Sequence, residues 1–147
     1  MALLLLKIQD GCDRFCSYCI IPYARGRSRS RNFDDIISEA RMLSSSGYQE
    51  VVITGINICA YGLDFENNAI GLCDVVKGIA ACEGIRRIRL GSMEPMYLSK
   101  SVVEEFAEID KLCKHFHISL QSGSDRVLEA MNRKYDSRFF KELITEI

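Results

Sequence analysis

Residues 3–19, LLLLKIQDGCDRFCSYC, decide the fold, because an apolar run ends there in a polar turn and three cysteines follow at once. The apolar run predicts a β-strand over residues 3–9 that ends at this turn. The cysteines after it have the spacing Cys12-x-x-x-Cys16-x-x-Cys19. The sequence therefore predicts a strand that carries three thiols on one short loop at its carboxyl end.

The rest of the chain alternates short apolar runs with longer amphipathic ones. The apolar runs suit buried parallel strands and predict three more strands, at residues 51–54, 86–90 and 116–120. The amphipathic segments have helical spacing and predict helices at residues 34–46, 72–82, 99–112, 124–131 and 139–147. Strands that alternate with helices indicate an α/β fold with about four βα units, a parallel sheet and right-handed crossovers.

Polar, glycine-containing or acidic segments directly follow the later three predicted strands. They are TGIN at residues 54–57, SMEP at 92–95 and QSG at 121–123. In parallel sheets, the residues that do chemistry gather at the carboxyl ends of the strands. We therefore expect these segments and the cysteine loop to surround one site.

The composition is that of an ordinary globular domain, with 48% apolar and 27% charged residues in a chain of 147. The net charge of -1 excludes a general attraction to nucleic acid, so any such role needs a local basic patch. The early apolar run, residues 2–6, is far shorter than the ~20 residues of a membrane span, and it lacks the flanks of a secretory signal. We expect a cytoplasmic protein without a membrane partner.

Seven cysteines are an odd number, whereas a secreted disulfide framework favours an even number in a short, turn-rich chain. In a reducing compartment, clustered cysteines more often bind metal, and the cluster here is confined to residues 12–19. The other four are single residues in apolar surroundings, Cys59, Cys73, Cys82 and Cys113. We expect each of these four to pack as a small hydrophobic side chain.

Three thiolates on one loop can hold three corners of a cubane iron–sulfur cluster and leave the fourth iron open to a small molecule. Two other interpretations stay open at this point. A structural zinc site would need a fourth ligand such as His115 or His117, which we expect to be structural residues of a strand. An electron-transfer module of the ferredoxin type would need a fourth cysteine.

Residues 7–26, KIQDGCDRFCSYCIIPYARG, closely resemble the radical S-adenosylmethionine (SAM) methylthiotransferases. Tyr18 matches the aromatic residue that commonly precedes the last cysteine in that superfamily. The resemblance continues over almost the whole chain, through residues 54–57, 61–62, 89–95, 117–125 and 131–135. It implies that the sheet is a partial (β/α) barrel of the radical SAM type.

The resemblance implies two cofactors, a [4Fe–4S] cluster and SAM. The metal ligands, which are also the catalytic residues, are then Cys12, Cys16 and Cys19. The residues expected to bind SAM are Tyr18, Thr54, Gly55, Asn57, Glu94, Gln121 and Ser122. From the residues alone, Gly55 and Gly123 could serve only to permit tight turns, and Glu94 could be a solvated loop carboxylate.

Within the family, residues 9–11 and 20–26 look most like the branch that modifies N6-threonylcarbamoyladenosine next to the tRNA anticodon. By resemblance, a 5'-deoxyadenosyl radical would abstract hydrogen from C2 of the adenine before a methylthio group is delivered. The partners implied are tRNA and an electron donor such as flavodoxin or ferredoxin. The branches that act on isopentenyladenosine in tRNA or on ribosomal protein stay open as alternatives.

Four arginines alternate with small residues after the cysteine loop, at Arg25, Arg27, Arg29 and Arg31. If this segment is extended, alternate side chains share one side. We then expect a basic patch that binds tRNA phosphates at the mouth of the cluster site. A solvated loop that leads into the next helix is the alternative interpretation.

The family pattern extends beyond this chain at both ends. Its members carry an amino-terminal domain with a second cluster and a carboxyl-terminal RNA-binding domain, and their barrels usually have six βα units. We therefore interpret residues 1–147 as a truncated radical SAM core domain that does not complete methylthiolation alone. An inactive fragment that keeps the cluster stays open as an alternative, and the last strand is expected to expose an edge that favours association.

Overall fold

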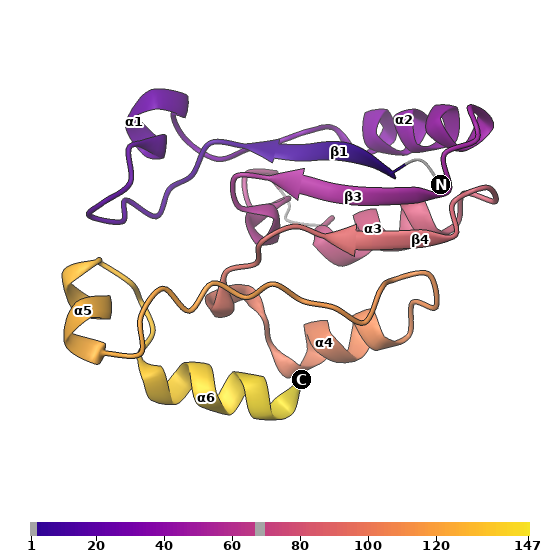
Figure 1. Cartoon of the computed structure of the whole chain (residues 1–147). Helices are drawn as coiled ribbons and strands as arrows, with labels where there is room; N and C mark the ends of the chain where they lie inside the picture. Colours follow the sequence, from indigo (N-terminus) through magenta and orange to yellow (C-terminus); the bar gives the residue numbers. More distant parts are fainter. Residues whose placement is uncertain (1–2, 67–69) are drawn as a thin grey trace.

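The computed structural model describes residues 3–66 and 70–147, and a four-stranded sheet lies at the centre of the fold (Figure 1). The strand order is β2-β1-β3-β4. Three of the strands are parallel, namely β1 (Leu3–Asp10), β3 (Glu50–Gly55) and β4 (Arg87–Leu90). The short strand β2 (Arg29–Ser30) pairs antiparallel with the carboxyl end of β1. Met1 and Ala2 of the predicted domain lie outside the described residues.

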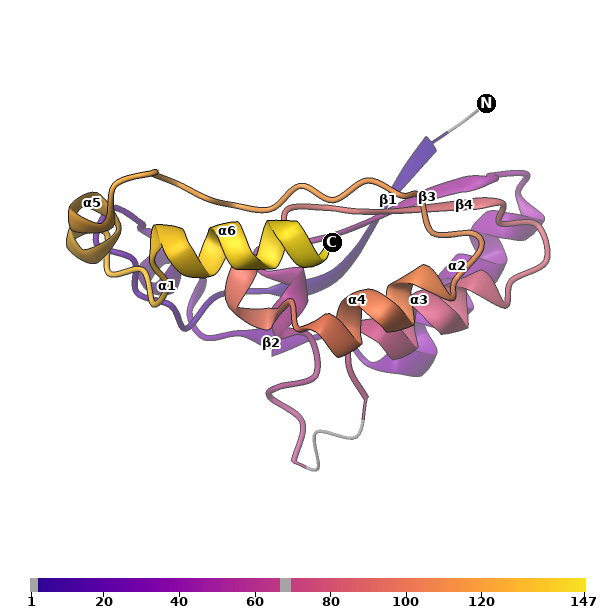
Figure 2. The same ribbon diagram turned by 90° about the horizontal axis from the view of Figure 1, so that it is seen from below.

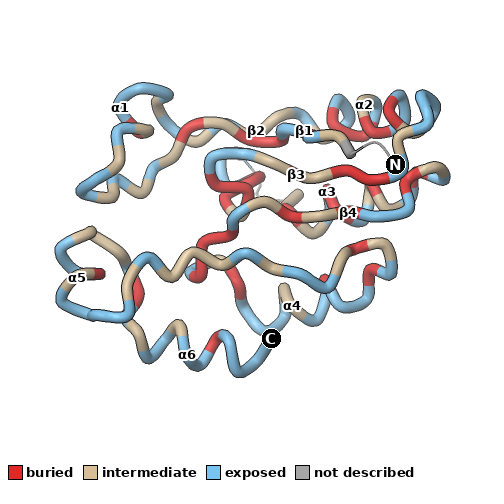
Figure 3. Tube along the Cα trace, in the orientation of Figure 1, coloured by how far each residue is buried: buried red, intermediate tan, exposed pale blue. Residues whose placement is uncertain are grey.

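Three amphipathic helices cover one face of the sheet, as Figure 2 shows from below. They are α2 (Phe33–Ser45), α3 (Leu72–Ala80) and α4 (Lys100–Ala107). The core between the layers is built of fully buried aliphatic side chains, among them Leu6, Ile8, Ile36, Ala40, Val51, Ile53, Val75, Val76, Ile79 and Ile88. Figure 3 shows how this buried layer follows the strands and the inner sides of α2 and α3. Removal of these side chains from water sets the register of the strands.

Local sequence signals explain where the helices begin and end. Asn32 caps α2 by accepting hydrogen bonds from the backbone N–H groups of Asp34 and Asp35, at 2.8 and 3.3 Å. Gly47 follows the end of this helix with a φ of 88°. Ser99 caps α4, because its hydroxyl accepts from the backbone N–H of Val102 in the first turn at 3.3 Å.

The prediction of a regular strand at residues 116–120 is wrong. An extended segment runs alongside β4 at this place (Figure 1). Two isolated parallel bridges join this part of the chain to β4 and the residues after it. Ile88 of β4 pairs with Leu112, and Met93 pairs with Ile118. Between the bridges the chain bends, because the backbone N–H of His115 donates to the carbonyl of Cys113 at 2.7 Å. A parallel ladder needs evenly spaced bonds, so this bend interrupts it.

The remaining elements lie toward the end of the sheet to which the parallel strands point (Figures 1 and 2). They include α1 (Ile21–Arg25) and α5 (Asp125–Ala130), and α5 is followed by α6 (Ser137–Glu146). Two 3₁₀ helices, Ile58–Ala60 and Pro95–Tyr97, follow β3 and β4. No helix within the described residues is both long and apolar enough to cross a membrane.

β1 is followed by Gly11, whose φ of +71° is one that residues with a side chain rarely adopt. A Cβ atom there would lie 1.9 Å from the carbonyl oxygen of Arg27. The next residue, Cys12, closes the same turn, since its backbone N–H donates to the carbonyl of Gly26 at 3.1 Å. The cysteine loop therefore depends on glycine at this position for its path.

We expect Gly11→Ala to lower the free energy of unfolding by more than about 1 kcal/mol, because it adds backbone strain and a steric clash. The matched control is Gly123→Ala, since a Cβ at Gly123 would have no atom within 4 Å and its φ is not positive. The control should change stability by no more than about 0.5 kcal/mol. Urea unfolding followed by circular dichroism measures both, and equal stabilities would contradict the requirement for glycine.

Candidate functional site

A cavity of about 380 Å³ lies at the carboxyl ends of the three parallel strands. All three cysteines of the loop line it. Gly55, Asn57 and Glu94, which end or follow β3 and β4, line it as well. The topology of the sheet thus brings residues that are far apart in the sequence to one place.

The end of α5 holds the cysteine loop in place. The hydroxyl of Ser17 donates to the carbonyl of Ala130 at 2.8 Å, and its backbone N–H donates to the carbonyl of Met131 at 3.2 Å. The side-chain amide of Asn132 donates to the carbonyl of Phe15 at 2.9 Å. Phe15 and Asn132 both have left-handed backbone, with φ of 48° and 57°. Such strained conformations persist where surrounding contacts hold them, and they cluster at functional sites.

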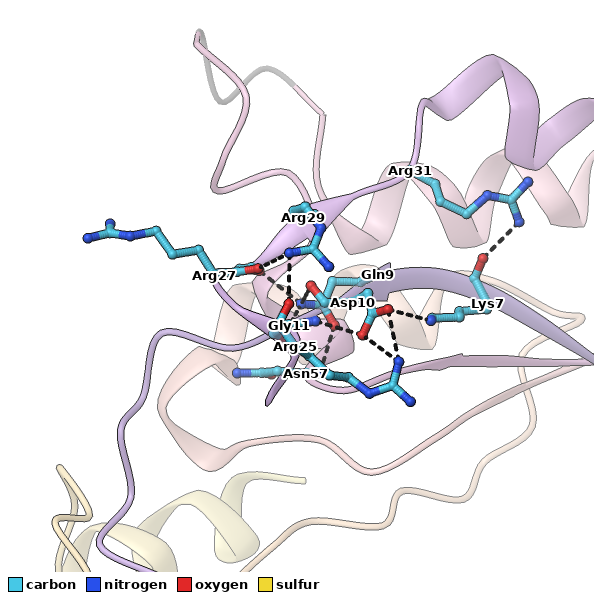
Figure 4. Close-up of polar contacts among 10 residues, drawn as sticks. Lys7, Gln9, Asp10, Gly11, Arg25, Arg27, Arg29, Arg31 and Asn57 are labelled. Carbon is cyan, nitrogen blue, oxygen red and sulfur yellow. Dashed lines mark hydrogen bonds and ion pairs between the residues drawn. The ribbon is translucent and has the colours of Figure 1, made fainter. Parts of the chain in front are cut away.

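The amide of Gln9 connects the loop to the sheet, although this side chain is fully buried. Its nitrogen lies 2.9 Å from the carbonyl of Asp10, 2.8 Å from that of Gly11 and 2.9 Å from Oγ of Ser28, and donates toward all three. Its oxygen accepts from the backbone N–H of Asn57 at 2.8 Å. Figure 4 shows the amide among these contacts. A buried amide without partners is costly, so these contacts specify how the ends of β1 and β3 meet.

Glu94, which follows β4, is 8% exposed and lies between two arginines. Its Oε2 accepts from Nε of Arg14 and from Nδ2 of Asn57, each at 2.9 Å. Its Oε1 lies 3.5 Å from Nη1 of Arg133. The alternative that Glu94 is a solvated loop carboxylate is therefore wrong. One carboxylate between two guanidinium groups leaves net positive charge in the wall of the cavity.

Two buried side-chain atoms have no hydrogen-bond partner among the described residues, Oδ1 of Asn57 and Nε of Arg133. Both residues line the cavity. An unpaired buried acceptor or donor costs about 1–3 kcal/mol. These atoms therefore indicate that the cavity accommodates polar groups from outside the chain.

The three thiols of the loop suit three corners of an iron–sulfur cluster. Within the described residues, no group of three or more histidine, cysteine, aspartate and glutamate side chains is placed to hold one metal ion. A cubane cluster binds its thiolates at separate corners, which suits thiols that share a cavity without meeting at one point. Burial raises the pKa of the Cys12 thiol, so metal binding there displaces a proton.

The histidines give the zinc interpretation no support. Neither His115 nor His117 is among the described residues that line the cavity. Nδ1 of His117 instead lies 3.1 Å from Oγ of Ser92, within hydrogen-bond distance. A zinc site that draws its fourth ligand from either histidine would therefore need a different arrangement of the chain.

Of the other residues predicted to bind SAM, two line the cavity and two do not. Tyr18 and Gln121 line the cavity, and Gln121 has a left-handed φ of 68°. Thr54 and Ser122 are not among the described residues that line it. Oγ of Ser122 accepts from the backbone N–H of Ser124 at 3.1 Å, close to the start of α5. A role in SAM binding stays a prediction for all of them.

Gly55 and Gly123 differ in what the backbone requires. A Cβ at Gly55 would lie 3.0 Å from the carbonyl oxygen of Gln9 and 3.1 Å from a methyl group of Ile58, so a side chain there would crowd the end of β1. Gly123 has open space around it. Close approach of backbone thus favours glycine at position 55 but not at position 123.

Sequence reasoning missed three residues of this site, Gln9, Arg14 and Arg133. A polar residue at the end of an apolar strand was a usable signal for Gln9, because a buried amide needs partners. The two arginines meet through Glu94, and no spacing in the sequence reveals that contact.

The four arginines after the loop do not lie on one extended segment, so the condition for a shared patch is not met, and a role of all four in tRNA binding stays a prediction. Gly26 turns the chain between α1 and β2 with a φ of 76°, and Figure 4 shows the four side chains pointing in different directions. Three of them bind within the protein: Arg25 to Asp10 at 3.2 Å, Arg29 to the carbonyl of Arg25 at 2.9 Å, and Arg31 to Glu39 at 2.7 Å. The guanidinium of Arg27 has no hydrogen-bond or ion-pair partner within the described residues, although the carbonyl of Arg27 accepts from Nη1 of Arg29 at 3.2 Å. Arg27 also lines a second cavity of about 420 Å³ together with Cys12.

The four cysteines outside the loop pack against the apolar core or lie near it. Cys82 is buried, as predicted, whereas Cys59, Cys73 and Cys113 are partly exposed. Burial raises the pKa of Cys59 to about 12 and that of Cys73 to about 11. These two thiols therefore stay protonated near neutral pH, which suits packing rather than nucleophilic chemistry.

A hydrogen bond from Lys7 and one from the backbone N–H of Gly11, helped by the charge of Arg25, lower the pKa of Asp10 from 3.8 to about 2. A carboxyl group with a lowered folded-state pKa stabilises the fold above its unfolded pKa, and this stabilisation disappears as the pH falls through the folded value. We expect this contribution to disappear between about pH 4 and pH 2, and Asp10→Asn to lose less stability over that window. Urea midpoints at about pH 5 and pH 3 measure the difference, and equal losses in the two proteins would contradict it.

A sequence model of the radical SAM superfamily matches residues 6–147. The chain belongs to this superfamily. Its cofactors, a [4Fe–4S] cluster and SAM, are those that the sequence predicted, and the donor set of the cavity fits them. The radical SAM methyltransferase TsrM from Kitasatospora setae has the same fold, with a TM-score of 0.73 at 16% identity over 98% of this chain and 28% of that chain. The expected partial radical SAM barrel is thus confirmed.

Two relatives are more similar in sequence to this radical SAM chain. One from Alkaliphilus oremlandii is 41% identical and one from Desulforamulus reducens is 42% identical, each over 142 residues. Both are named tRNA-2-methylthio-N(6)-dimethylallyladenosine synthase. The matches cover 97% of this chain but 30% and 31% of those proteins, so the chain spans about a third of their length. These names agree with the methylthiotransferase resemblance and do not support the threonylcarbamoyladenosine branch.

Proposed function

We propose that this chain is the SAM-cleaving core of a tRNA methylthiotransferase. The observation that carries the proposal is the cavity, where three cysteines of an open ligand set share the walls with the unpaired Oδ1 of Asn57. When bound, the cluster would supply an electron for cleavage of the sulfonium bond and an open iron for the amino and carboxylate groups of SAM. The chain itself holds the cluster, orients SAM and limits access of water.

Asn57 is the residue best placed to orient the amino group of SAM. Its backbone N–H is taken by Gln9 and its amide nitrogen by Glu94, which leaves Oδ1 as a free acceptor. An amino group that gives its lone pair to iron would keep only N–H donors, so it would complement this oxygen. Gln9 and Glu94 act as positioning residues, because they hold the amide of Asn57 in one orientation. Gly55 lets the backbone of β3 pass close to β1 at the same place.

The proposed substrate is an N6-modified adenosine in tRNA, with methylthiolation at C2. The names of the relatives favour N6-dimethylallyladenosine, the isopentenyl type that the sequence left as an alternative. Residues 9–11 and 20–26 favour N6-threonylcarbamoyladenosine, which is the second candidate. The reaction also requires an electron donor, for which flavodoxin or ferredoxin is suitable.

Arg27 is the residue of the arginine segment that we propose for contact with RNA. Arg27 is exposed, its guanidinium has no partner within the described residues, and it lines the second cavity together with Cys12. A guanidinium suits phosphate oxygens because its donors form a planar fork. The internal contacts of Arg25, Arg29 and Arg31 reduce what they can offer to a phosphate.

We expect the reconstituted and reduced chain to convert SAM to 5'-deoxyadenosine, and Cys16→Ala to abolish this product by removing one cluster ligand. Cys113→Ala is the matched control, because it removes a partly exposed thiol outside the cavity. Anaerobic reconstitution with iron and sulfide, dithionite reduction and chromatography of the products provide the measurement. A wild-type chain that binds about four irons without cleaving SAM would instead favour the inactive, cluster-binding interpretation.

We expect Arg27→Met to weaken binding of an anticodon stem–loop RNA and to reduce the slope of log affinity against log salt by about 0.7–1. Arg126→Met is the control, because it removes an exposed arginine from α5. Fluorescence anisotropy with two RNAs, one for each modified adenosine, measures the affinity and shows which modification the chain prefers. Tighter binding of the threonylcarbamoyl RNA would reverse the proposed order of substrates, and unchanged binding by Arg27→Met would remove Arg27 from the interface.

A further inference from the structure

Arg133, which follows α5, is a buried cation whose surroundings fix its side chain. The side chain is 9% exposed. Its Nη2 donates to the hydroxyl of Tyr18 at 2.8 Å, and its Nη1 lies 3.5 Å from Oε1 of Glu94. The guanidinium carbon also lies 5.9 Å from the ring centroids of Tyr18 and Tyr135, within the range of cation–π attraction. The side chain is therefore held in one position before any ligand binds.

One donor of this guanidinium, Nε, has no partner within the described residues. Arg133 lines the same cavity as Cys16, and Tyr18, its hydrogen-bond partner, lies in the loop between Cys16 and Cys19. The unpaired donor thus belongs to a residue that shares this cavity with the thiol of Cys16.

The local charge balance is also positive. Glu94 is the carboxylate that contacts Arg133, and it is shared with Arg14. Arg14 is itself stacked on Tyr97, with its guanidinium carbon 4.8 Å from the ring centroid. Two guanidinium groups against one carboxylate leave an excess positive charge beside the thiols.

We propose that Arg133 donates a hydrogen bond from Nε to the sulfur of Cys16 when this cysteine ligates the cluster, and thereby raises the reduction potential of the cluster. The inference rests on the proposed function, because it needs the cluster in this cavity. Cluster potentials depend on net charge, on hydrogen bonds to the sulfurs and on exposure to solvent. A fixed positive charge and a hydrogen bond to sulfur both favour the reduced cluster, which carries one more electron. Arg133 is then a positioning residue that makes the reductive step easier.

The test is a redox titration of the reconstituted chain without SAM, followed by electron paramagnetic resonance. Arg133→Met removes the charge and the donors, and we expect the midpoint potential to move to a more negative value. Arg133→Lys keeps a charge but loses the Nε donor, and we expect an intermediate value. Arg126→Met removes one exposed arginine of α5 and should leave the potential unchanged. Iron content and circular dichroism identify variants that hold the cluster in a folded chain.

The outcomes separate this inference from the proposed function. Folded Arg133→Met and Arg133→Lys proteins with the wild-type iron content and the wild-type potential would overturn the inference alone. A wild-type potential accompanied by weaker SAM binding would also overturn it, because Nε would then serve the SAM carboxylate. If Arg133→Met does not hold iron, the midpoint potential of Arg133→Lys is compared with that of the wild type. A more negative potential supports the inference, and an unchanged potential overturns it. A wild-type chain that binds no cluster would overturn both proposals.

Discussion

The buried amide of Gln9 is the contact on which the rest of the site depends. It is fully buried at the end of β1, and its oxygen fixes the backbone of Asn57 at the end of β3. Its nitrogen fixes the turn that leads into the cysteine loop. Because a buried amide must find partners, one arrangement of these strand ends is strongly favoured. From Asn57 the same chain of contacts continues to Glu94 at the end of β4, so three strand ends share one polar network.

The cysteine loop is also held by the far end of the chain. Ser17 and Phe15 are bound by the residues that end α5, and Arg133 reaches back to Tyr18 and Glu94. The loop is therefore held by residues that lie more than a hundred positions further along the chain, such as Asn132, which binds Phe15. This arrangement suits a group held by three thiolates, because such a group is anionic and the arginines in the wall balance its charge.

The arginine segment shows that charges expected to bind an RNA partner can instead be neutralised by contacts within the protein. Arg25 ends the short helix α1, whose first turn Pro22 favours, whereas Arg29 lies in strand β2, so the four arginines do not share one extended segment. Asp10 and Glu39 then bind two of the arginines within the protein. Arg27 is the member of the segment left with an unpaired guanidinium, since no acidic side chain of the described residues binds it. In this chain, whose net charge is -1, three of the four arginines thus bind groups within the protein.

The sequence by itself determined the alternation of strands and helices, the three-cysteine loop and the superfamily. Each of these is a local signal: an apolar run, an amphipathic segment with helical spacing, or a fixed spacing of thiols. It also placed Asn57 and Glu94 near the loop, because the carboxyl ends of parallel strands meet at one edge. Only the tertiary structure decided that residues 116–120 form one isolated bridge, Ile118 with Met93 after β4, and that Gln9, Arg14 and Arg133 belong to the site. Those features depend on contacts between residues far apart in the sequence. Whether a donor is buried and has a partner can be seen only after the chain has folded.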